Sequence, residues 1–205
     1  MIRFSKSTKD VSNQNMGLVF EYLNTLKSVV ASTDVKGESC DTLQDGLRVF
    51  IQKAVNANEN GNKLIFVGNG GSAGICTHSA NDYAKNGGFR STALHDGAVL
   101  TCLGNDFGFE NIFSRQLSGI GNKGDVLYAT STSGASENVL QAILEANKMG
   151  ISVICLTGEN LTNMSKNANV TINTPSSDTN YIQEMHIAIG QLICGIVEDH
   201  FFKNQ

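Results

Sequence analysis

Residues 63–72, Lys-Leu-Ile-Phe-Val-Gly-Asn-Gly-Gly-Ser, decide the fold class of this chain. The apolar run Lys63–Val67 predicts a buried strand, and the glycine turn after it leads into a helical pattern over Ala73–Lys85. The same order of apolar run, turn and helical pattern recurs towards the C-terminus. Such alternation predicts an α/β protein in which helices cover both faces of a parallel, doubly wound sheet.

Four further strands and four further helices complete the expected three-layer α-β-α architecture with five parallel strands. The expected strands are Val99–Leu103, Asp125–Thr130, Ser152–Leu156 and Val170–Ile172. The expected helices are Phe109–Ile120, Ala135–Met149, Leu161–Asn167 and Thr179 to about Phe202. Two helical patterns come first, Met16–Val30 and Leu43–Val55, with a break over Thr33–Glu38. We expect a single domain over 61–205, preceded by a helical segment, 1–60, that packs on it or on a subunit interface.

Composition narrows the class of protein. The 205 residues suffice for one domain, and the net charge of −4 argues against a protein that binds nucleic acid through many phosphates. The five cysteines are odd in number and form no Cys-x-x-Cys pair, which favours reduced thiols in the cytoplasm over disulfides or a thiolate metal site. The polar start, residues 1–10, precedes no apolar stretch of a secretion signal, and no apolar run has the length of a membrane span.

The glycine turn Gly68-Asn69-Gly70-Gly71-Ser72 is a candidate binding site. Ligands of such sheets bind beyond the carboxyl ends of the strands. Glycines there let the backbone approach a ligand, and the following helix contributes free N–H groups. The turn is not a dinucleotide fingerprint, because position 73 is Ala, and no Gly-Lys-Ser/Thr makes it a P-loop. The alternative is a tight turn that only caps a helix.

A second candidate is the hydroxyl-rich turn 131–136, Ser-Thr-Ser-Gly-Ala-Ser. Short hydroxyl donors at a helix start suit a phosphate group, while capping of the helix is the alternative. Without Lys or Arg in the turn, binding would depend on neutral donors, as a small phosphosugar would tolerate. A weaker third candidate, Gly104–Phe109, offers Asn105 and Asp106, although Asn-Asp is also common in turns.

Two helices carry titratable candidates. His78 and Asp82 stand four residues apart, so they share one helix face and could hold a metal ion together. An ordinary polar contact is the alternative. In the closing helix, Gln183, His186 and Gln191 interrupt an apolar stretch, and a histidine satisfied within the core is the alternative for His186.

Taken together, these segments resemble the sugar isomerase (SIS) domain family, and within it the phosphoheptose isomerases. The resemblance spans residues 60–200 and rests on the turn 68–72, His78, Gly104–Gly108, the turn 131–134 and the segment 182–186. It implies a cytoplasmic homotetramer whose sites are completed by neighbouring subunits. The implied partner is a phosphorylated sugar, with neither nucleic acid nor membrane.

The resemblance also implies roles for individual residues. The phosphate would be held by Ser131, Thr132, Ser133 and Ser136. The sugar site would be lined by Asn69, Gly70, Gly71, Ser72, Asn105, Asp106 and Gln183. A zinc ion would be bound by His78, Asp82, Gln183 and Gln191.

Two implied zinc ligands depart from the family pattern of His, Glu, Gln and His. Asp82 keeps the carboxylate of the family's general base but is one methylene shorter. Gln191 replaces a histidine and has no titratable proton, so it cannot act as an acid or base. The zinc site would therefore be weakened. Asp82 and His186 are the expected catalytic residues, with His95 a further possible substitute for the missing histidine.

Two functions follow from these observations. The first is an aldose–ketose isomerase that converts sedoheptulose 7-phosphate to D-glycero-D-manno-heptose 7-phosphate through an enediol, for heptose in lipopolysaccharide or capsule. The second is a catalytically impaired SIS protein that serves as a phosphosugar-binding regulator or as an interaction module of the type that associates with a replication initiator. Intact binding turns beside an altered proton-transfer pair support binding more firmly than turnover.

Overall fold

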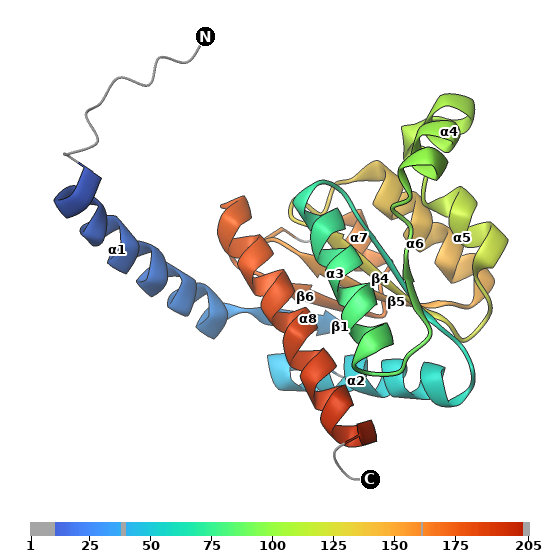
Figure 1. Cartoon of the computed structure of the whole chain (residues 1–205), viewed down its shortest axis with the longest axis horizontal. Helices are drawn as coiled ribbons and strands as arrows, with labels where there is room; N and C mark the ends of the chain where they lie inside the picture. Colours follow the sequence, from blue (N-terminus) through green and yellow to red (C-terminus); the bar gives the residue numbers. More distant parts are fainter. Residues whose placement is uncertain (1–10, 38–39, 161, 203–205) are drawn as a thin grey trace.

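A computed structural model describes residues 11–37, 40–160 and 162–202. A six-stranded sheet lies at its centre, with helices on both faces, and one helix extends away from the body (Figure 1). The expectation that residues 1–10 carry no targeting signal lies outside the described residues. No helix within the described ranges is long and apolar enough to span a membrane.

The elements follow one another in an order close to the expected one. The strands are β1 Asp34–Gly37, β2 Leu64–Gly68, β3 Ser91–Ala93, β4 Val126–Ser131, β5 Ser152–Thr157 and β6 Val170–Asn173. The helices are α1 Val11–Ser32, α2 Leu43–Glu59, α3 Gly71–Lys85, α4 Gly97–Phe107, the 3-10 helix η1 Phe109–Asn111, α5 Ser114–Ile120, α6 Glu137–Met149, α7 Asn163–Lys166 and α8 Thr179–Phe202. The α/β doubly wound fold is confirmed.

The strand order is β1-β6-β5-β4-β2-β3, with every pair parallel except β1 with β6. Along the chain, strands after β2 are added first on one side, as β3, and then on the other, as β4. The order therefore reverses between β2 and β4, which is where sheets of this type bind ligands.

Successive side chains of a strand point to opposite faces of the sheet, and helices cover both faces. The apolar strands are therefore buried on both faces. Phe66 and Tyr128 point to the layer of α2, α3 and α8, whereas Ile65 and Leu127 point to the layer of α5 and α6. The two resulting cores hold the sheet between them, so the turns at its carboxyl edge stand on a rigid base.

One expected strand is wrong. Val99–Leu103 lies within helix α4, and Asp96 begins that helix by accepting a hydrogen bond from the backbone N–H of Val99 at 3.0 Å. The strand at this point is the three-residue β3, Ser91–Ala93, which pairs with the edge of β2. The apolar run 99–103 reads equally as strand or helix, and the N-cap residue decides between them.

A sixth strand was not expected. β1 lies in the segment 33–38 that we expected only as a break, and it pairs antiparallel with β6 at the other edge of the sheet. α2 packs on the same sheet, so both elements of the segment 33–60 contribute to the main core.

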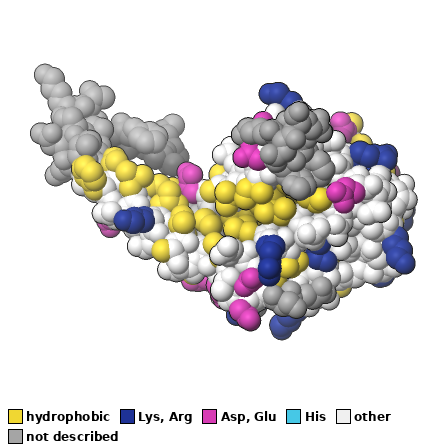
Figure 2. All heavy atoms as spheres, turned by 90° about the horizontal axis from the view of Figure 1, so that it is seen from below, with side chains coloured by type: hydrophobic (Ala, Val, Ile, Leu, Met, Phe, Trp, Pro, Cys, Tyr) yellow, Lys and Arg dark blue, Asp and Glu magenta, His cyan; other side chains and the backbone are white. Residues whose placement is uncertain are grey.

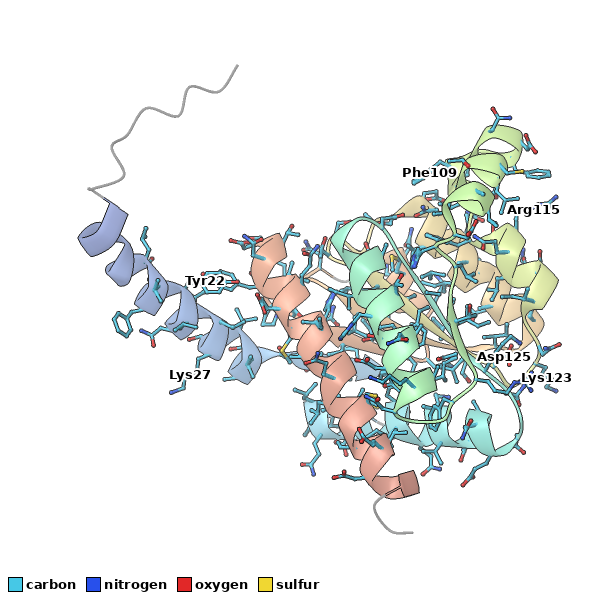
Figure 3. All side chains as sticks on the ribbon, viewed as in Figure 1. Tyr22, Lys27, Phe109, Arg115, Lys123 and Asp125 are labelled. Atoms are coloured by element: carbon cyan, nitrogen blue, oxygen red, sulfur yellow. The ribbon has the colours of Figure 1, made fainter. Side chains whose placement is uncertain are left out.

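α1 and α8 together expose an apolar surface. The large side chains of this surface are Leu18, Val19, Phe20, Leu23 and Val30 on α1 and Leu192 and Ile196 on α8, all at least 41% exposed. Hydrophobic side chains run along α1 and continue onto the adjoining body (Figure 2). Tyr22 points from α1 towards α8, where its ring lies 4.7 Å from that of Tyr181 (Figure 3). We call this set the α1–α8 apolar surface.

At the amino ends of the strands, Asp125 joins β2 and β4. It accepts hydrogen bonds from the Lys63 ammonium at 2.7 Å, from the backbone of Lys63 and Asn122, and from the Asn62 side chain. Burial by itself would raise the pKa of Asp125, but these bonds hold it below its usual value. The carboxylate is therefore a charged tie between two strand starts.

We predict that Asp125→Ala lowers the free energy of unfolding by about 3 kcal/mol, because Lys63 and two backbone N–H groups lose their buried partner. Urea denaturation at pH 7 measures this. Since the folded pKa is lowered, the contribution is present above about pH 4 and lost as the pH falls further. Glu145→Ala, which breaks the more exposed pair with Lys148, should cost less than about 1 kcal/mol. Equal losses in the two variants would contradict the prediction.

Candidate active site

The two candidate turns lie side by side at the carboxyl edge of the sheet. Gly68 ends β2 and pairs with Thr130, the residue before the end of β4. The glycine turn and the turn 131–136 therefore leave neighbouring strands at the same level, and each leads into a helix, α3 or α6. This is the point where the strand order reverses.

The glycine turn leaves the first N–H groups of α3 without a side-chain cap. Gly70 is the N-cap, with φ 54° and ψ −122°, a conformation that residues with a side chain rarely adopt. A Cβ at Gly71 would stand 2.5 Å from the Gln183 amide nitrogen, so the Gln183 side chain of α8 reaches the backbone at the start of α3. The buried Ser72 follows. The open end of the fifteen-residue α3 can thus bind an anionic or strongly polar ligand.

In the second turn, three hydroxyl groups converge before α6. Ser131 Oγ lies 2.9 Å from Ser136 Oγ and 3.5 Å from Ser133 Oγ. Ser136 is the N-cap of α6, yet its side chain makes no capping bond and turns to Ser131 instead. Three hydroxyls around an uncapped helix start form a compact set of donors for a phosphate group.

The two turns are joined by a pair of side-chain amides that the sequence reasoning missed in part. The Asn69 amide donates to Asn138 Oδ1 at 2.8 Å, and the Asn138 amide donates back to Asn69 Oδ1 at 3.0 Å. Asn138, in the first turn of α6, is buried. Its place on the inner face of an amphipathic helix was the available signal, since a buried amide needs a partner. Asn69 is therefore a brace between the turns as well as a candidate ligand.

A cleft of about 240 Å³ opens beside the hydroxyl turn. Its walls are Thr132, Ser133, Glu159, Asn160, Ser176, Ser177, Thr179 and Ile182. All of these residues lie in the loops after β4, β5 and β6 or at the start of α8, so the cleft belongs to the carboxyl edge of the sheet. The Glu159 carboxylate and the Asn160 amide are polar groups near the hydroxyl turn that the sequence reasoning did not single out.

α3 and α8 bring three of the four implied metal ligands together. His78 Nε2 lies 3.1 Å from Asp82 Oδ2 and 3.4 Å from the Gln191 amide nitrogen. All three groups are accessible to solvent. The fourth, Gln183 of α8, lies instead against Gly71 at the start of α3, two helical turns before His78. The i,i+4 pair is thus a real contact, and Gln191 completes it from the facing helix.

The chemistry of this donor set fits tight zinc binding poorly. Zinc prefers thiolate, imidazole and carboxylate ligands, and His78 and Asp82 supply only two of these. Among the described residues, no group of three or more His, Cys, Asp or Glu side chains is placed to hold a metal ion. Gln183 and Gln191 add amide oxygens, which are weaker ligands.

His186 lies in the core and not at the surface of the site. It is fully buried and its Nε2 stands 3.2 Å from the carbonyl oxygen of Thr157, to which it donates. Burial lowers the pKa of His186 to about 4, so the ring is neutral at pH 7. This position favours a structural role for His186 and does not favour its expected role as a catalytic acid.

Asn105 and Asp106 lie apart from the two turns within one chain. Both are exposed near the C-terminal end of α4, which projects from the body (Figure 1), and the Asn105 amide donates to Asp106 Oδ1 at 2.8 Å. Arg115 of α5, labelled in Figure 3, lies over the Phe107 ring, 4.0 Å from its centre, and so holds the end of α4 to α5. One chain alone therefore does not bring these two residues into the cleft.

Comparison with known proteins agrees with this geometry. The family model described as "SIS domain" matches residues 31–158. A phosphoheptose isomerase of Aneurinibacillus thermoaerophilus is 41% identical over 189 residues, which cover 88% of this chain and 96% of that protein. One from Rhodospirillum rubrum is 48% identical over 145 residues, or 68% and 77% of the two chains. The solved phosphoheptose isomerase of Neisseria gonorrhoeae has a TM-score of 0.80 at 30% identity, with 89% and 98% covered.

We predict that Gln191→His raises the affinity for zinc roughly 100-fold, because a second imidazole would join His78 and Asp82. The contacts of 3.1 and 3.4 Å around His78 Nε2 are spaced as ligands of one ion would be. Competition with a chromophoric chelator measures the affinity. Leu192→His, one residue further along the exposed side of α8, is the control and should bind zinc as the wild type does. The prediction is wrong if both histidines change the affinity alike.

Proposed function

This chain belongs to the SIS domain family and, within it, to the phosphoheptose isomerases, and we propose that it converts sedoheptulose 7-phosphate to D-glycero-D-manno-heptose 7-phosphate. It is an aldose–ketose isomerase. The single observation that supports this substrate class best is the convergence of the hydroxyls of Ser131, Ser133 and Ser136 beside the glycine turn.

The phosphate of the substrate would bind the hydroxyl turn. Ser131, Ser133 and Ser136, with Thr132 in the adjoining cleft, offer neutral donors, and the start of α6 adds its N–H groups and positive dipole. The sugar would extend past Gly70, Gly71 and Ser72 towards α8, where Gln183 reaches the start of α3. Asn69, already paired with Asn138, retains one N–H and one oxygen lone pair for a sugar hydroxyl.

Asp82 is the group that would move the carbon-bound proton. Its carboxylate would take the proton from C1 of the ketose to give the enediol, exchange it with solvent, and deliver a proton to C2, while a proton passes from O1 to O2. His78 contacts both Asp82 and Gln191, and His78 and Gln191 would bind the two sugar oxygens. This arrangement supports Asp82 as the base more firmly than His186, which is enclosed by the core.

A bound metal belongs to this proposal only as a weak zinc site. His78 and Asp82 would be its stronger ligands, and the amides of Gln183 and Gln191 its weaker ones.

A homotetramer would complete the site. The α1–α8 apolar surface exposes seven large hydrophobic side chains, and contiguous exposed apolar surfaces of this kind mark contacts between subunits. α4 also exposes Val99 and Phe107, so its end can pack against a second copy. In that assembly Asn105 and Asp106 would reach the site of a neighbouring subunit. The cytoplasm suits cysteines that form no disulfide, such as Cys76, Cys102, Cys155 and Cys194. We place the product in the synthesis of heptose for lipopolysaccharide or capsule.

A second candidate function is supported by Gln191. An amide at the place implied for a titratable histidine would leave phosphosugar binding intact and impair turnover. The chain would then act as a phosphosugar-binding regulator or an interaction module. Turnover of the natural substrate distinguishes the two functions.

We predict that the wild type isomerises sedoheptulose 7-phosphate and that Asp82→Asn lowers kcat by at least about 100-fold, because the amide cannot accept the carbon-bound proton. A discontinuous assay of the aldose product measures the rate. Asp45→Asn, on the exposed start of α2, should keep the wild-type rate. If Asp82→Asn keeps more than about a third of the rate, Asp82 is not the base. If the wild type binds the sugar phosphate without converting it, the second function holds.

A further inference from the structure

We propose that His95 is a positioning residue that holds the glycine turn in its binding conformation. His95 comes from the loop between β3 and α4 and does not belong to either candidate turn. This inference rests on the proposed function, since it assigns the turn to sugar-phosphate binding.

His95 contacts β2 beyond the point where its pairing with β3 ends. β3 ends at Ala93, and the N–H of Leu94 makes the last backbone bond of this edge, to the carbonyl of Phe66 at 3.1 Å. Gly68 continues β2 two residues further, with its edge facing no strand residue. His95 Nε2 lies 2.9 Å from the Gly68 carbonyl oxygen and 3.3 Å from the Gly68 nitrogen. The imidazole thus covers the open edge of β2 at the residue where the glycine turn begins.

Two neighbours fix the orientation of the ring. Thr77 Oγ1, on α3, lies 3.2 Å from His95 Nδ1, and the ring meets Phe113 edge-on with centroids 5.5 Å apart. Nε2 can either accept from the Gly68 N–H or donate to the Gly68 carbonyl, and the shorter contact favours donation to the carbonyl. In that tautomer Nδ1 accepts from the Thr77 hydroxyl. Burial lowers the pKa of His95 and its bond to Gly68 opposes this only in part, so the ring is neutral at pH 7.

The glycine turn needs such a support. Its glycines have no side chains to pack, and Gly70 lacks any side-chain capping bond. On one side, β2 is fixed by its pairing with β4 at Thr130. On the other side, His95 is the contact at the level of Gly68. Since Thr77 belongs to the helix that follows the turn, the ring joins the end of β2 to α3 across the turn itself.

The consequence is an effect on binding and not on the chemical step. Loss of the Nε2–H group would free the Gly68 carbonyl and let the turn sample other conformations. The turn would then have to be ordered by the substrate, which weakens binding in proportion to the competent fraction. Asp82 lies on α3, three turns beyond the glycine turn, and would keep its position.

Two isosteric variants test this assignment. The glutamine amide of His95→Gln reaches the position of Nε2 and can donate to the Gly68 carbonyl, whereas the shorter amide of His95→Asn reaches only the position of Nδ1. We expect His95→Asn to raise KM for sedoheptulose 7-phosphate about tenfold, with kcat changed less than about threefold. His95→Gln should recover most of the wild-type KM. Thr92→Val, in the cleft beside His95 on β3, is the control and should behave as the wild type does.

Hydrogen exchange measured by mass spectrometry supplies a readout that does not depend on turnover. The peptide that contains Gly68–Gly71 should exchange about tenfold faster in His95→Asn than in the wild type, His95→Gln or Thr92→Val. If exchange in this peptide is unchanged in His95→Asn, or if His95→Gln and His95→Asn have the same KM, the inference is overturned. A wild type that shows no turnover contradicts the proposed function, while faster exchange in His95→Asn would still support the positioning of the turn.

Discussion

The parallel pairing of β2 with β4 is the constraint on which the site depends. Gly68 and Thr130 pair at the end of this ladder. The chain after β2 continues into α3 on one face of the sheet, and the chain after β4 continues into α6 on the other face. Two helices therefore begin next to each other with their N–H groups at one edge. The cores on both faces keep the two strands from shifting, so the turns inherit a fixed separation.

The rest of the site is built from side chains that connect those turns to their surroundings. The Asn69–Asn138 amide pair joins the turns to each other, and Gln183 brings α8 to the start of α3. Further along the same two helices, His78, Asp82 and Gln191 meet in an accessible cluster. In the proposed function, phosphate binding and proton transfer would use different parts of α3 and its neighbours, so one could be altered in sequence while the other is kept.

The sequence allowed the strands β2, β4, β5 and β6, both turns and the His78–Asp82 contact to be predicted, because each depends on local pattern or helical spacing. β3 could not be predicted, since three residues at a sheet edge carry no periodicity, and the run Val99–Leu103 fits a strand as well as a helix. Burial of His186 and the support of Gly68 by His95 are tertiary effects. Asn105 and Asp106 lie near the C-terminal end of α4, which projects from the body (Figure 1), a tertiary placement that local pattern does not determine.

The central claim is that this chain converts a ketose phosphate to an aldose phosphate through an enediol. Incubation of the purified protein with sedoheptulose 7-phosphate in D₂O, followed by NMR of the sugar carbons, tests it most directly. Proton transfer by an accessible carboxylate predicts deuterium at C2 of the aldose and, on reversal, at C1 of the ketose. Saturable binding of the sugar phosphate with no deuterium at either carbon would contradict the account and leave a binding protein on an isomerase fold.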